Sequence, residues 1–474
     1  MNFINKSSKE IKNSRRSLWF DRKKKKVIPK ILDLTRGSTS HGIPNIFKTD
    51  RLSIRLLWSV CFLAALGACS YMVFLIITDY FAYNTVSNID YVSEITSEFP
   101  AVSFCNLNPL TTFESELFLQ EILAELGSNS TNAYKDLAAL DQANNIAKLR
   151  AFNPEFGDER RKTLGYDLNL VECKFNSVTC TKQDFYWFFD INQGNCFRYS
   201  SGLSMPIEKS TKAGSRYGLR LTLFVPKSAN RLSTAYSDGL RVFVHNSSIE
   251  PTDSDGFYVE PGKASFVAVE RTFVSKQPHP YSECKDLSSF SSEFYDYFKA
   301  NNKTYRQKDC IFFCFQKRVI LNCSCYNLYH PRLFDATPCV SRRQVDCVDR
   351  QYGLFKSSEI DEECLSQCPL ECESIDYDLT ISSAAYPTRN YFEFNKDYFN
   401  GTRDFEELRS SLYKINIFYP NLGYVELEEL PQTSVIDLLS NIGGTMGLYI
   451  GISFLSLIEI VEVVLEVIFI SFSA

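Results

Sequence analysis

The sequence predicts a membrane protein of mixed α and β structure, in which two transmembrane helices flank one large extracellular domain stapled by disulfides. Three observations carry this prediction. The two longest apolar runs of the 474 residues lie near the two ends of the chain. Fourteen of the sixteen cysteines lie between those runs, and an even number confined to one segment is typical of a disulfide framework in an oxidising compartment. The segment between the runs mixes helical and strand-like patterns.

The amino-terminal segment, residues 1–50, is basic, and we expect it to lie in the cytosol. Residues 1–55 carry fifteen Lys and Arg against four Asp and Glu. A basic run such as Arg22–Lys26 is also found in nuclear-localisation and nucleic-acid-binding segments. Beside a membrane span, however, it fits the positive-inside rule and contacts anionic lipid. Membrane lipids are therefore an expected partner, whereas the net charge of −5 argues against nucleic acid.

Residues 51–78 are predicted to form the first transmembrane helix. Its apolar part, Ile54–Ile77, exceeds the about 20 residues that a helix needs to cross a bilayer. Small residues between Ala64 and Ser70 allow close helix contact, and aromatic residues after Asp79 suit the outer interface. With the amino end inside, residues 79–432 are extracellular. The protein is then a multi-pass protein of the plasma membrane with both termini in the cytosol.

The extracellular segment, residues 79–432, contains both kinds of regular structure. Strands are predicted at 99–105, 216–225, 265–274 and 424–429, and helices at 113–126, 133–149 and within 284–318. The C-x3-C and C-x-C spacings also occur in zinc sites, but His330 is the one histidine near them, so no metal site is expected. Five N-x-S/T sequons are predicted glycosylation sites: Asn129, Asn246, Asn302, Asn322 and Asn400.

Residues 433–474 form the second span, which we predict to line a pore. Four glycines would weaken a helix that faced only lipid: Gly443, Gly444, Gly447 and Gly451. Three carboxylates lie at membrane depth on one helix face, where ionisable groups mark an ion pathway: Glu459, Glu462 and Glu466. The alternative, a solvated helix face just inside the membrane, is evenly balanced for Glu466. The triplet Gly451-Ile452-Ser453 is expected to interrupt the helix, unless it only provides a small-residue helix contact.

Several motifs in the same order resemble those of the degenerin/epithelial sodium channel family. They cover nearly the whole chain, from His41-Gly42 and the FPAVSFCN sequence at Phe99–Asn106 to the Gly451–Ser453 triplet. Two cysteine patterns lie between them, C-x3-C-x8-C-x-C and C-x3-C-x3-C, formed by Cys310, Cys314, Cys323, Cys325, Cys364, Cys368 and Cys372. This resemblance implies a trimer of the chain itself or of related subunits. It also implies a hand-shaped extracellular domain of palm, finger, knuckle and thumb, and a sodium-selective pore that amiloride blocks. No cofactor is expected, and sodium is the permeant ion.

The resemblance also assigns roles to single residues. It implies a selectivity filter at Gly451, Ile452 and Ser453, followed inward by carboxylate rings from Glu459 onward. It places the outer gate and the amiloride region at Ser440, with Gly443 and Gly444 allowing a bend; close packing against the first span is the other reading of these two glycines. His41 and Gly42 are implied to act in gating. An aromatic contact of Tyr83 with Tyr281 would couple thumb and pore, although two unrelated surface tyrosines are an equal alternative. The implied disulfides are Cys105–Cys196, Cys173–Cys180, Cys284–Cys372, Cys310–Cys368, Cys314–Cys364, Cys323–Cys347 and Cys325–Cys339.

The stimulus that opens the channel is the least determined feature: an extracellular peptide is the first candidate, and proton and force remain open as alternatives. Acid-sensing relatives carry His where this chain has Thr85, an acidic residue where it has Tyr91, and Asp where it has Asn441. These departures disfavour proton gating. The aromatic run Phe185–Phe189, with Phe197, offers apolar area to a peptide, while carboxylates of the domain suit a basic one. The competing interpretation is that most of these rings belong to the hydrophobic core.

Two other functional classes fit the sequence less well. A non-conducting cell-surface receptor with a disulfide-rich domain would need neither glycines nor carboxylates in its second span. An enzyme is not expected, because the chain has four histidines and no zinc-binding, nucleophile-elbow or phosphate-loop motif.

Overall fold

The computed structural model describes residues 42–127, 136–200, 202, 207–249, 251, 255–287, 290–301, 303–330, 336–355, 364–396, 399 and 404–472. The chain divides into two compact units. A membrane unit combines Met1–Val86 with Pro431–Ala474, and an extracellular unit comprises Ser87–Leu430. Each unit is described by itself.

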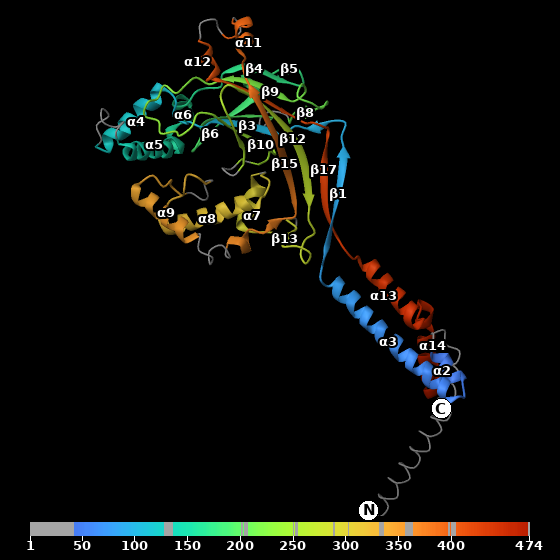
Figure 1. The fold of residues 1–474 in the computed structure, drawn as a ribbon. Coiled ribbons are helices and arrows are strands. Elements are labelled where there is room, and N and C mark those ends of the chain that lie inside the picture. The colour runs from blue at the N-terminus through green and yellow to red at the C-terminus, as the bar shows by residue number, and fades with distance from the viewer. Residues whose placement is uncertain are drawn as a thin grey trace, which may run out of the picture. The chain divides into compact units, whose positions relative to one another are not determined.

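The membrane unit is built on helix α3, Leu52–Tyr80, which has 29 residues. Among the described residues, α3 is the one helix that is long and apolar enough to cross a membrane. The short helix α2, Ile43–Lys48, and helix α13, Val435–Ile450, both pack against it (Figure 1). The half-buried and buried positions of α3 recur every three or four residues, which gives the helix one contact face.

The second apolar run forms two helices rather than one. Helix α13 ends at Ile450, and helix α14, Phe454–Phe472, begins after an interruption of three residues. With 16 residues, α13 is shorter than the about 20 that a straight span requires. The predicted interruption at Gly451–Ser453 is therefore confirmed.

The extracellular unit contains an eight-stranded sheet with the order β1-β17-β12-β16-β9-β4-β5, in which β15 also pairs with β12. Its strands are β1 Thr85–Ser93, β4 Leu170–Phe175, β5 Val178–Thr179, β9 Leu219–Phe224, β12 Lys263–Ser275, β15 Glu373–Ala385, β16 Leu412–Phe418 and β17 Gly423–Pro431. Strand β12 runs parallel to β16 and to β17 and antiparallel to β15. It therefore lies at the centre of the sheet's pairing.

A second sheet of five strands has the order β11-β10-β3-β7-β6. Its strands are β3 Ala101–Asn106, β6 Phe185–Asp190, β7 Gly194–Tyr199, β10 Leu240–His245 and β11 Phe257–Val259. Two ribbons, β2 Ser97–Glu98 with β8 Lys209–Ser210 and β13 Cys284–Lys285 with β14 Leu370–Glu371, complete the strands. One hydrophobic core joins the sheets, with Phe104 from the five-stranded sheet and Leu221, Val267 and Ile415 from the other.

Three helical groups surround the sheets, and each has a hydrophobic core of its own. The first comprises α4 Phe113–Glu125, α5 Leu137–Phe152 and α6 Asp158–Leu164; the second comprises α7 Glu293–Ala300, α8 Gln307–Cys323 and α9 Arg342–Phe355; the third comprises α11 Arg389–Phe394 and α12 Phe405–Arg409 (Figure 1). Local sequence explains where several begin. Thr112, Asp136 and Ser292 each accept a backbone N–H of the first turn of α4, α5 and α7, respectively, as N-cap residues do.

The predicted secondary structure agrees with these elements in most places. Strands predicted at 99–105, 216–225, 265–274 and 424–429 correspond to β3, β9, β12 and β17. The helix predicted at 113–126 is α4, and the described part of that predicted at 133–149 is α5. The helical segment predicted within 284–318 begins instead with β13 and then forms α7 and α8, because Cys284 and Lys285 pair with β14.

Seven disulfides staple the extracellular unit, and they are the seven pairs that the resemblance implies. Four of them involve cysteines of α8 or of the segment that follows it, and a fifth, Cys284–Cys372, closes the base of the same helical group. The other two cysteines, Cys61 and Cys69 on α3, are free.

Candidate functional site

The break between α13 and α14 begins with a glycine that ends the first helix. Gly451 has φ 68° and ψ 22°, the left-handed conformation that a side chain disfavours. Its N–H donates to the carbonyl oxygen of Gly447 over 3.1 Å, and the N–H of Ile452 donates to Met446 over 3.4 Å. These bonds close the end of the helix as a left-handed C-terminal cap does.

The break ends with a serine that starts the second helix. The Ser453 hydroxyl accepts the backbone N–H of Ser456 over 3.4 Å, while the Ser456 hydroxyl accepts the N–H of Ser453 over 3.1 Å. This reciprocal pair has the form of a capping box with serine in both positions. The triplet thus combines a helix stop and a helix start. Carbonyl groups in the last turn of α13 have no partner further along that helix, because its ladder of hydrogen bonds ends there.

One face of α13 carries only small residues. Ser440, Gly443, Gly444 and Gly447 follow one another at helical spacing, and Ser440 is exposed. Among the described residues, no atom lies within 4 Å of the place where a Cβ of Gly443 or Gly444 would stand. Packing of these two glycines against the first span, the alternative interpretation, is therefore not what this structure shows. The face is open in a single chain.

The three pore carboxylates of the prediction all lie on α14, beyond the break. Glu459 is half-buried and Glu462 is exposed, whereas the side chain of Glu466 lies outside what the structure describes. Their spacing of three and four residues places them on one face of a continuous helix. The helix therefore has the geometry that stacked carboxylates require, and their role stays a prediction.

The described half of the His-Gly motif, Gly42, has a structural reason for being glycine. It has φ 97°, and a Cβ there would lie 3.1 Å from a ring carbon of Phe62 on α3. Arg55 of α3 holds the other end of α2, donating to the carbonyl oxygens of Ile46 over 3.2 Å and of Thr49 over 3.1 Å. The motif thus opens a short helix fixed against the first span. His41 lies outside the described residues.

Tyr83 follows α3 in a turn with φ 52°. Its ring centroid lies 6.2 Å from that of Phe81 and 6.5 Å from that of Tyr80. These rings form the aromatic group expected near the outer interface. The contact of Tyr83 with Tyr281 would join the two units, so it stays a prediction.

Two of the five predicted glycosylation sites can be placed. Asn322 is exposed at the end of α8, as a glycan acceptor must be. Asn246 is half-buried, and its side-chain oxygen accepts the N–H and the hydroxyl of Ser248 in a local turn. Asn129, Asn302 and Asn400 lie outside the described residues.

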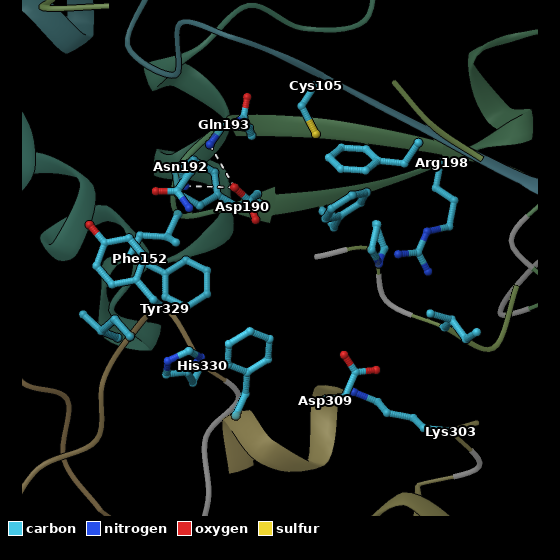
Figure 2. Close-up of a pocket in the computed structure, with 18 of the residues that line it drawn as sticks. Cys105, Phe152, Asp190, Asn192, Gln193, Arg198, Lys303, Asp309, Tyr329 and His330 are labelled. Carbon is cyan, nitrogen blue, oxygen red and sulfur yellow. Dashed lines mark hydrogen bonds between the residues drawn. The ribbon is translucent and has the colours of Figure 1, made fainter. Parts of the chain in front are cut away.

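The extracellular unit contains a cavity of about 1040 Å³, which lies between the β6–β7 hairpin and α8 (Figure 2). Its wall includes Phe152 at the end of α5, Tyr186 on β6, Phe312 on α8 and Tyr329 in the segment after α8. Segments from three parts of the sequence therefore meet around one space. Its size is at the upper end of the about 300–1,000 Å³ that ligand sites occupy in proteins.

The predicted aromatic run divides between core and cavity. Phe185 is buried in the core with Phe197, as the alternative interpretation expected for most of the run. The four residues that follow Phe185, from Tyr186 to Phe189, line the cavity.

The carboxylates of the cavity wall are already engaged within the chain. Asp190 accepts the backbone N–H groups of Asn192 and Gln193 over 2.8 and 2.9 Å, which fixes the hairpin turn (Figure 2). Asp309 is held by Arg306 in a bidentate pair with distances of 2.7 and 3.0 Å. Burial raises the pKa of Asp309, against the opposing effect of this arginine. These two carboxylates therefore stabilise the local fold, and the aromatic rings are the groups that the wall offers to a ligand.

Two buried histidines lie in or beside this region. His330 stacks on Phe312 with ring centroids 5.0 Å apart, and its Nε2 lies 2.7 Å from the hydroxyl of Tyr352. His245 lies next to the cavity residue Ser248 and contacts the Ser103 hydroxyl through Nε2 over 2.9 Å. Burial lowers the pKa of each to about 4, with Arg198 adding to the effect at His245. Both imidazoles are thus neutral near pH 7.

Arg198 and His330 were not predicted to belong to a binding site. Arg198 is buried on β7, where its Nε donates to Ser103 over 3.1 Å and its guanidinium lies 5.1 Å from the ring centroid of Phe188. It faces the same space as His330 (Figure 2). The two residues are far apart in the sequence, so only the tertiary structure brings them together.

Comparison with known proteins gives a consistent result. A family model described as "Amiloride-sensitive sodium channel" matches residues 34–463. Acid-sensing ion channel 1 of Gallus gallus is 29% identical over 456 residues, covering 91% of this chain and 83% of its own length. The human bile acid-sensitive ion channel is 27% identical over 458 residues, with 91% and 84% covered. A solved structure of a proton-activated chloride channel has a TM-score of 0.33 and 6% identity, which is too little similarity to carry an argument.

The family match spans most of the chain and agrees with the motifs, the two-unit architecture and the seven disulfides. We conclude that the chain belongs to the amiloride-sensitive sodium channel family, the degenerin/epithelial sodium channels, and is a membrane cation channel subunit of that family.

Proposed function

We propose that this chain forms a sodium-selective, amiloride-sensitive channel that an extracellular peptide opens. The observation that carries the proposal is the break at Gly451–Ser453, which lies within an apolar helical run and is followed by carboxylates on one helix face. The channel is a trimer of this chain or of related subunits. It lies in the plasma membrane with both termini in the cytosol, and it has no enzymatic activity.

The pore follows from the break and from symmetry. Non-helical backbone at membrane depth is tolerated where it lines water or is buried in protein. Three copies of Gly451–Ser453 would supply rings of carbonyls and hydroxyls that replace part of the hydration shell of sodium. Three copies of Glu459, Glu462 and Glu466 would attract cations and exclude anions below that filter.

The outer part of the pore is supported by the open face of α13. Ser440, Gly443 and Gly444 present a face without neighbours in the described chain, which leaves room for two further copies of the helix. Small residues at such a face let backbones approach closely. We assign the gate and the amiloride region to this face, and the bend of the gating helix to the two glycines.

The ligand site is assigned to the aromatic cavity. Its volume and its rings suit a short peptide with aromatic side chains, since binding sites are lined by hydrophobic and aromatic groups with a few polar ones. Since Asp190 and Asp309 are engaged, the wall supports aromatic recognition more than recognition of a basic side chain.

Proton gating is the second candidate, because relatives are named acid-sensing channels. His245 and His330 titrate near pH 4, so neither supplies a charge change between pH 7 and 6. This observation, with the departures at Thr85, Tyr91 and Asn441, ranks peptide above proton. No described feature singles out mechanical force.

Voltage clamp of cells expressing the full chain tests the proposal. RFamide peptides are applied at pH 7.4, acid steps follow, and each is repeated with amiloride. We expect an amiloride-blocked inward sodium current with peptide. A current with acid alone would replace the peptide by the proton as stimulus. No current under either condition, even when Ser440 is replaced by a bulky residue, would contradict the channel proposal for this chain by itself.

A cavity variant tests the ligand site. Tyr186→Ala removes a ring from the cavity wall, and we expect about a tenfold loss of apparent peptide affinity, as for an aromatic anchor worth about 1.4 kcal/mol. Tyr236→Ala is the matched control, because Tyr236 is 90% exposed and does not line the cavity. Equal affinities of the two variants would place the peptide elsewhere.

A further inference from the structure

An ion pair on β12, at the centre of the large sheet, contacts β1 and β17, the two strands that continue into the membrane helices. Arg271 of β12 pairs with Glu94, which follows β1 and lies 177 residues away in the sequence. Its side chain is 5% exposed, and the same guanidinium donates to the carbonyl oxygen of Gly423 at the start of β17 over 3.4 Å. One side chain therefore contacts the ends of both strands.

Aromatic rings enclose the cation of this pair. The guanidinium carbon of Arg271 lies 5.3 Å from the ring centroid of Tyr419 and 5.8 Å from those of Phe273 and Tyr424. On the other side, the hydroxyl of Ser97 donates to the Glu94 carboxylate over 2.6 Å. A planar guanidinium suits this site because it can stack on rings and donate to two oxygens at once, which an ammonium does less well.

The backbone around the pair is equally tight. The N–H of Glu94 donates to the carbonyl oxygen of Leu422 over 3.3 Å. Gly423 has φ 148°, and a Cβ there would lie 2.3 Å from the carbonyl oxygen of Val92. The end of β1 is thus pressed against the start of β17 at the point where Arg271 contacts both.

In the described sheet, β1 pairs with one neighbour, β17, and β17 in turn pairs with β12. β1 lies at the edge of the sheet, and its side chains are mostly exposed. β17 pairs with β12 only over Thr272–Ser275, directly after Arg271. Along the chain, β1 follows α3 and β17 precedes α13, so these two strands are the covalent links between the units.

We propose that Arg271, through Glu94 and Gly423, is a positioning residue that holds β1 and β17 on β12 and so controls how readily these two strands move when the channel opens. The pair does not contact the permeant ion or the cavity. It acts through the strands, and the proposal is independent of which stimulus opens the channel.

Hydrogen exchange of the purified full-length channel tests this role. In Arg271→Met, we expect amides of β1 and β17 to exchange about tenfold faster or more, because the half-buried carboxylate of Glu94 loses its partner. Amides of β9 and β16 should keep their wild-type rates. The double variant Arg271→Met/Glu94→Gln should exchange no faster than Arg271→Met, since both changes remove one interaction. Arg271→Lys should lie between the variant and wild type.

The matched control is the exposed pair Lys209–Glu98 of the neighbouring β2–β8 ribbon, with a distance of 3.8 Å. Lys209→Met and Glu98→Gln should leave the exchange of β1 and β17 unchanged. Unchanged exchange of these strands in Arg271→Met would overturn the proposal. So would an equal rise across β9 and β16, which would mean a general loss of stability.

Voltage clamp gives the functional readout, with acid steps and RFamide peptides as probes. We expect Arg271→Met to shift the half-activating concentration of the effective probe about tenfold while the reversal potential stays the same. An unchanged midpoint, or a changed reversal potential, would contradict a positioning role. If neither probe opens the wild-type channel, the exchange result decides.

Discussion

Gly218 in the extracellular unit and Gly443 and Gly444 in the membrane unit lack a side chain for opposite reasons. In the extracellular unit, a Cβ on Gly218 would lie 2.0 Å from the carbonyl oxygen of Ile417, because strands approach too closely there for any side chain. In the membrane unit, no described atom lies within 4 Å of such a Cβ on Gly67, Gly443 or Gly444. The first kind of glycine completes contacts within the chain. The second leaves a helix face free for another surface.

The disulfides show the same difference. All seven lie in the extracellular unit, whereas the two cysteines of α3 are free. Covalent cross-links within the chain therefore stabilise the extracellular unit. The membrane unit exposes large apolar side chains such as Ile436 and Leu448, which lipid or further copies must cover. Changes of equal size should thus cost more stability in the first unit than in the second.

The largest expected loss of stability is that of a long-range disulfide. Cys284→Ser/Cys372→Ser opens a link with a sequence separation of 88, and Cys173→Ser/Cys180→Ser opens one with a separation of 7. The intact Cys310–Cys368 bond shortens the loop that Cys284–Cys372 closes to about 30 residues, so loop-closure entropy predicts losses of about 3–4 and about 2–3 kcal/mol in the free energy of unfolding. Thermal unfolding of the purified variants measures both. Equal losses would mean that chain entropy does not govern the stapling.

The next largest loss of stability is expected at a crowded glycine, and open glycines provide the comparison. Gly218→Ala should destabilise the extracellular unit by about 3 kcal/mol, because the backbone of β16 must shift. Gly443→Ala should leave the unfolding temperature within experimental error. Gly353→Ala, on α9 with no described atom within 4 Å, is the control within the extracellular unit and should not destabilise it. A large loss with Gly443→Ala would show that α13 is packed within one chain.

The two buried histidines predict that the stability of the extracellular unit depends on pH. Burial holds the pKa of His245 and of His330 at about 4, below the ordinary value of about 6.5. Unfolding lets each imidazole bind a proton between these values, so stability is fully present above about pH 6.5 and falls as the pH drops toward 4. We expect about 2 kcal/mol per histidine to be lost by pH 5.

Unfolding of the histidine variants over a pH series checks this expectation. His330→Gln should flatten part of the slope between about pH 6.5 and 4, whatever its effect at neutral pH, because the titrating group is gone. A slope identical to that of the wild type would assign the acid sensitivity to other groups.

Among the changes expected to destabilise the protein, those at the helix break should cause the smallest loss. Gly451→Ala places a side chain at φ 68° and should cost about 1–2 kcal/mol locally, and Ser453→Ala removes the cap of α14 for about 1 kcal/mol. Unlike the changes above, both should alter the sodium-to-potassium permeability ratio, which is measured from the reversal potential. Unchanged permeation in both variants would remove this segment from the filter.

Features governed by local sequence could be predicted, and the helix break is one case. Glycine and serine carry stop and start signals within three residues, so Gly451 and Ser453 favoured an interruption between α13 and α14. A small-residue helix contact fitted the same residues, and the resemblance was needed to choose between the two. Strands such as β9 and β12 were predicted from local sequence patterns. The seven disulfides are different, because fourteen cysteines permit many pairings and only the resemblance selected one.

Features that depend on distant segments could not be predicted from the residues. Arg271 and Glu94 are 177 residues apart, and neither position is unusual in its local sequence. The cavity likewise requires α5, β6 and α8 to meet. The aromatic run at 185–189 indicated part of its wall, but which rings enter the core depends on tertiary packing and not on composition.

The sodium selectivity of the pore is tested most directly by the reversal potential of the channel current. Cells expressing the full chain are activated under voltage clamp while external sodium is replaced stepwise by potassium. We expect an amiloride-blocked current whose reversal potential follows the sodium gradient and shifts strongly negative as sodium is replaced. A current that amiloride does not block, or a reversal potential that stays constant through the exchange, would contradict it.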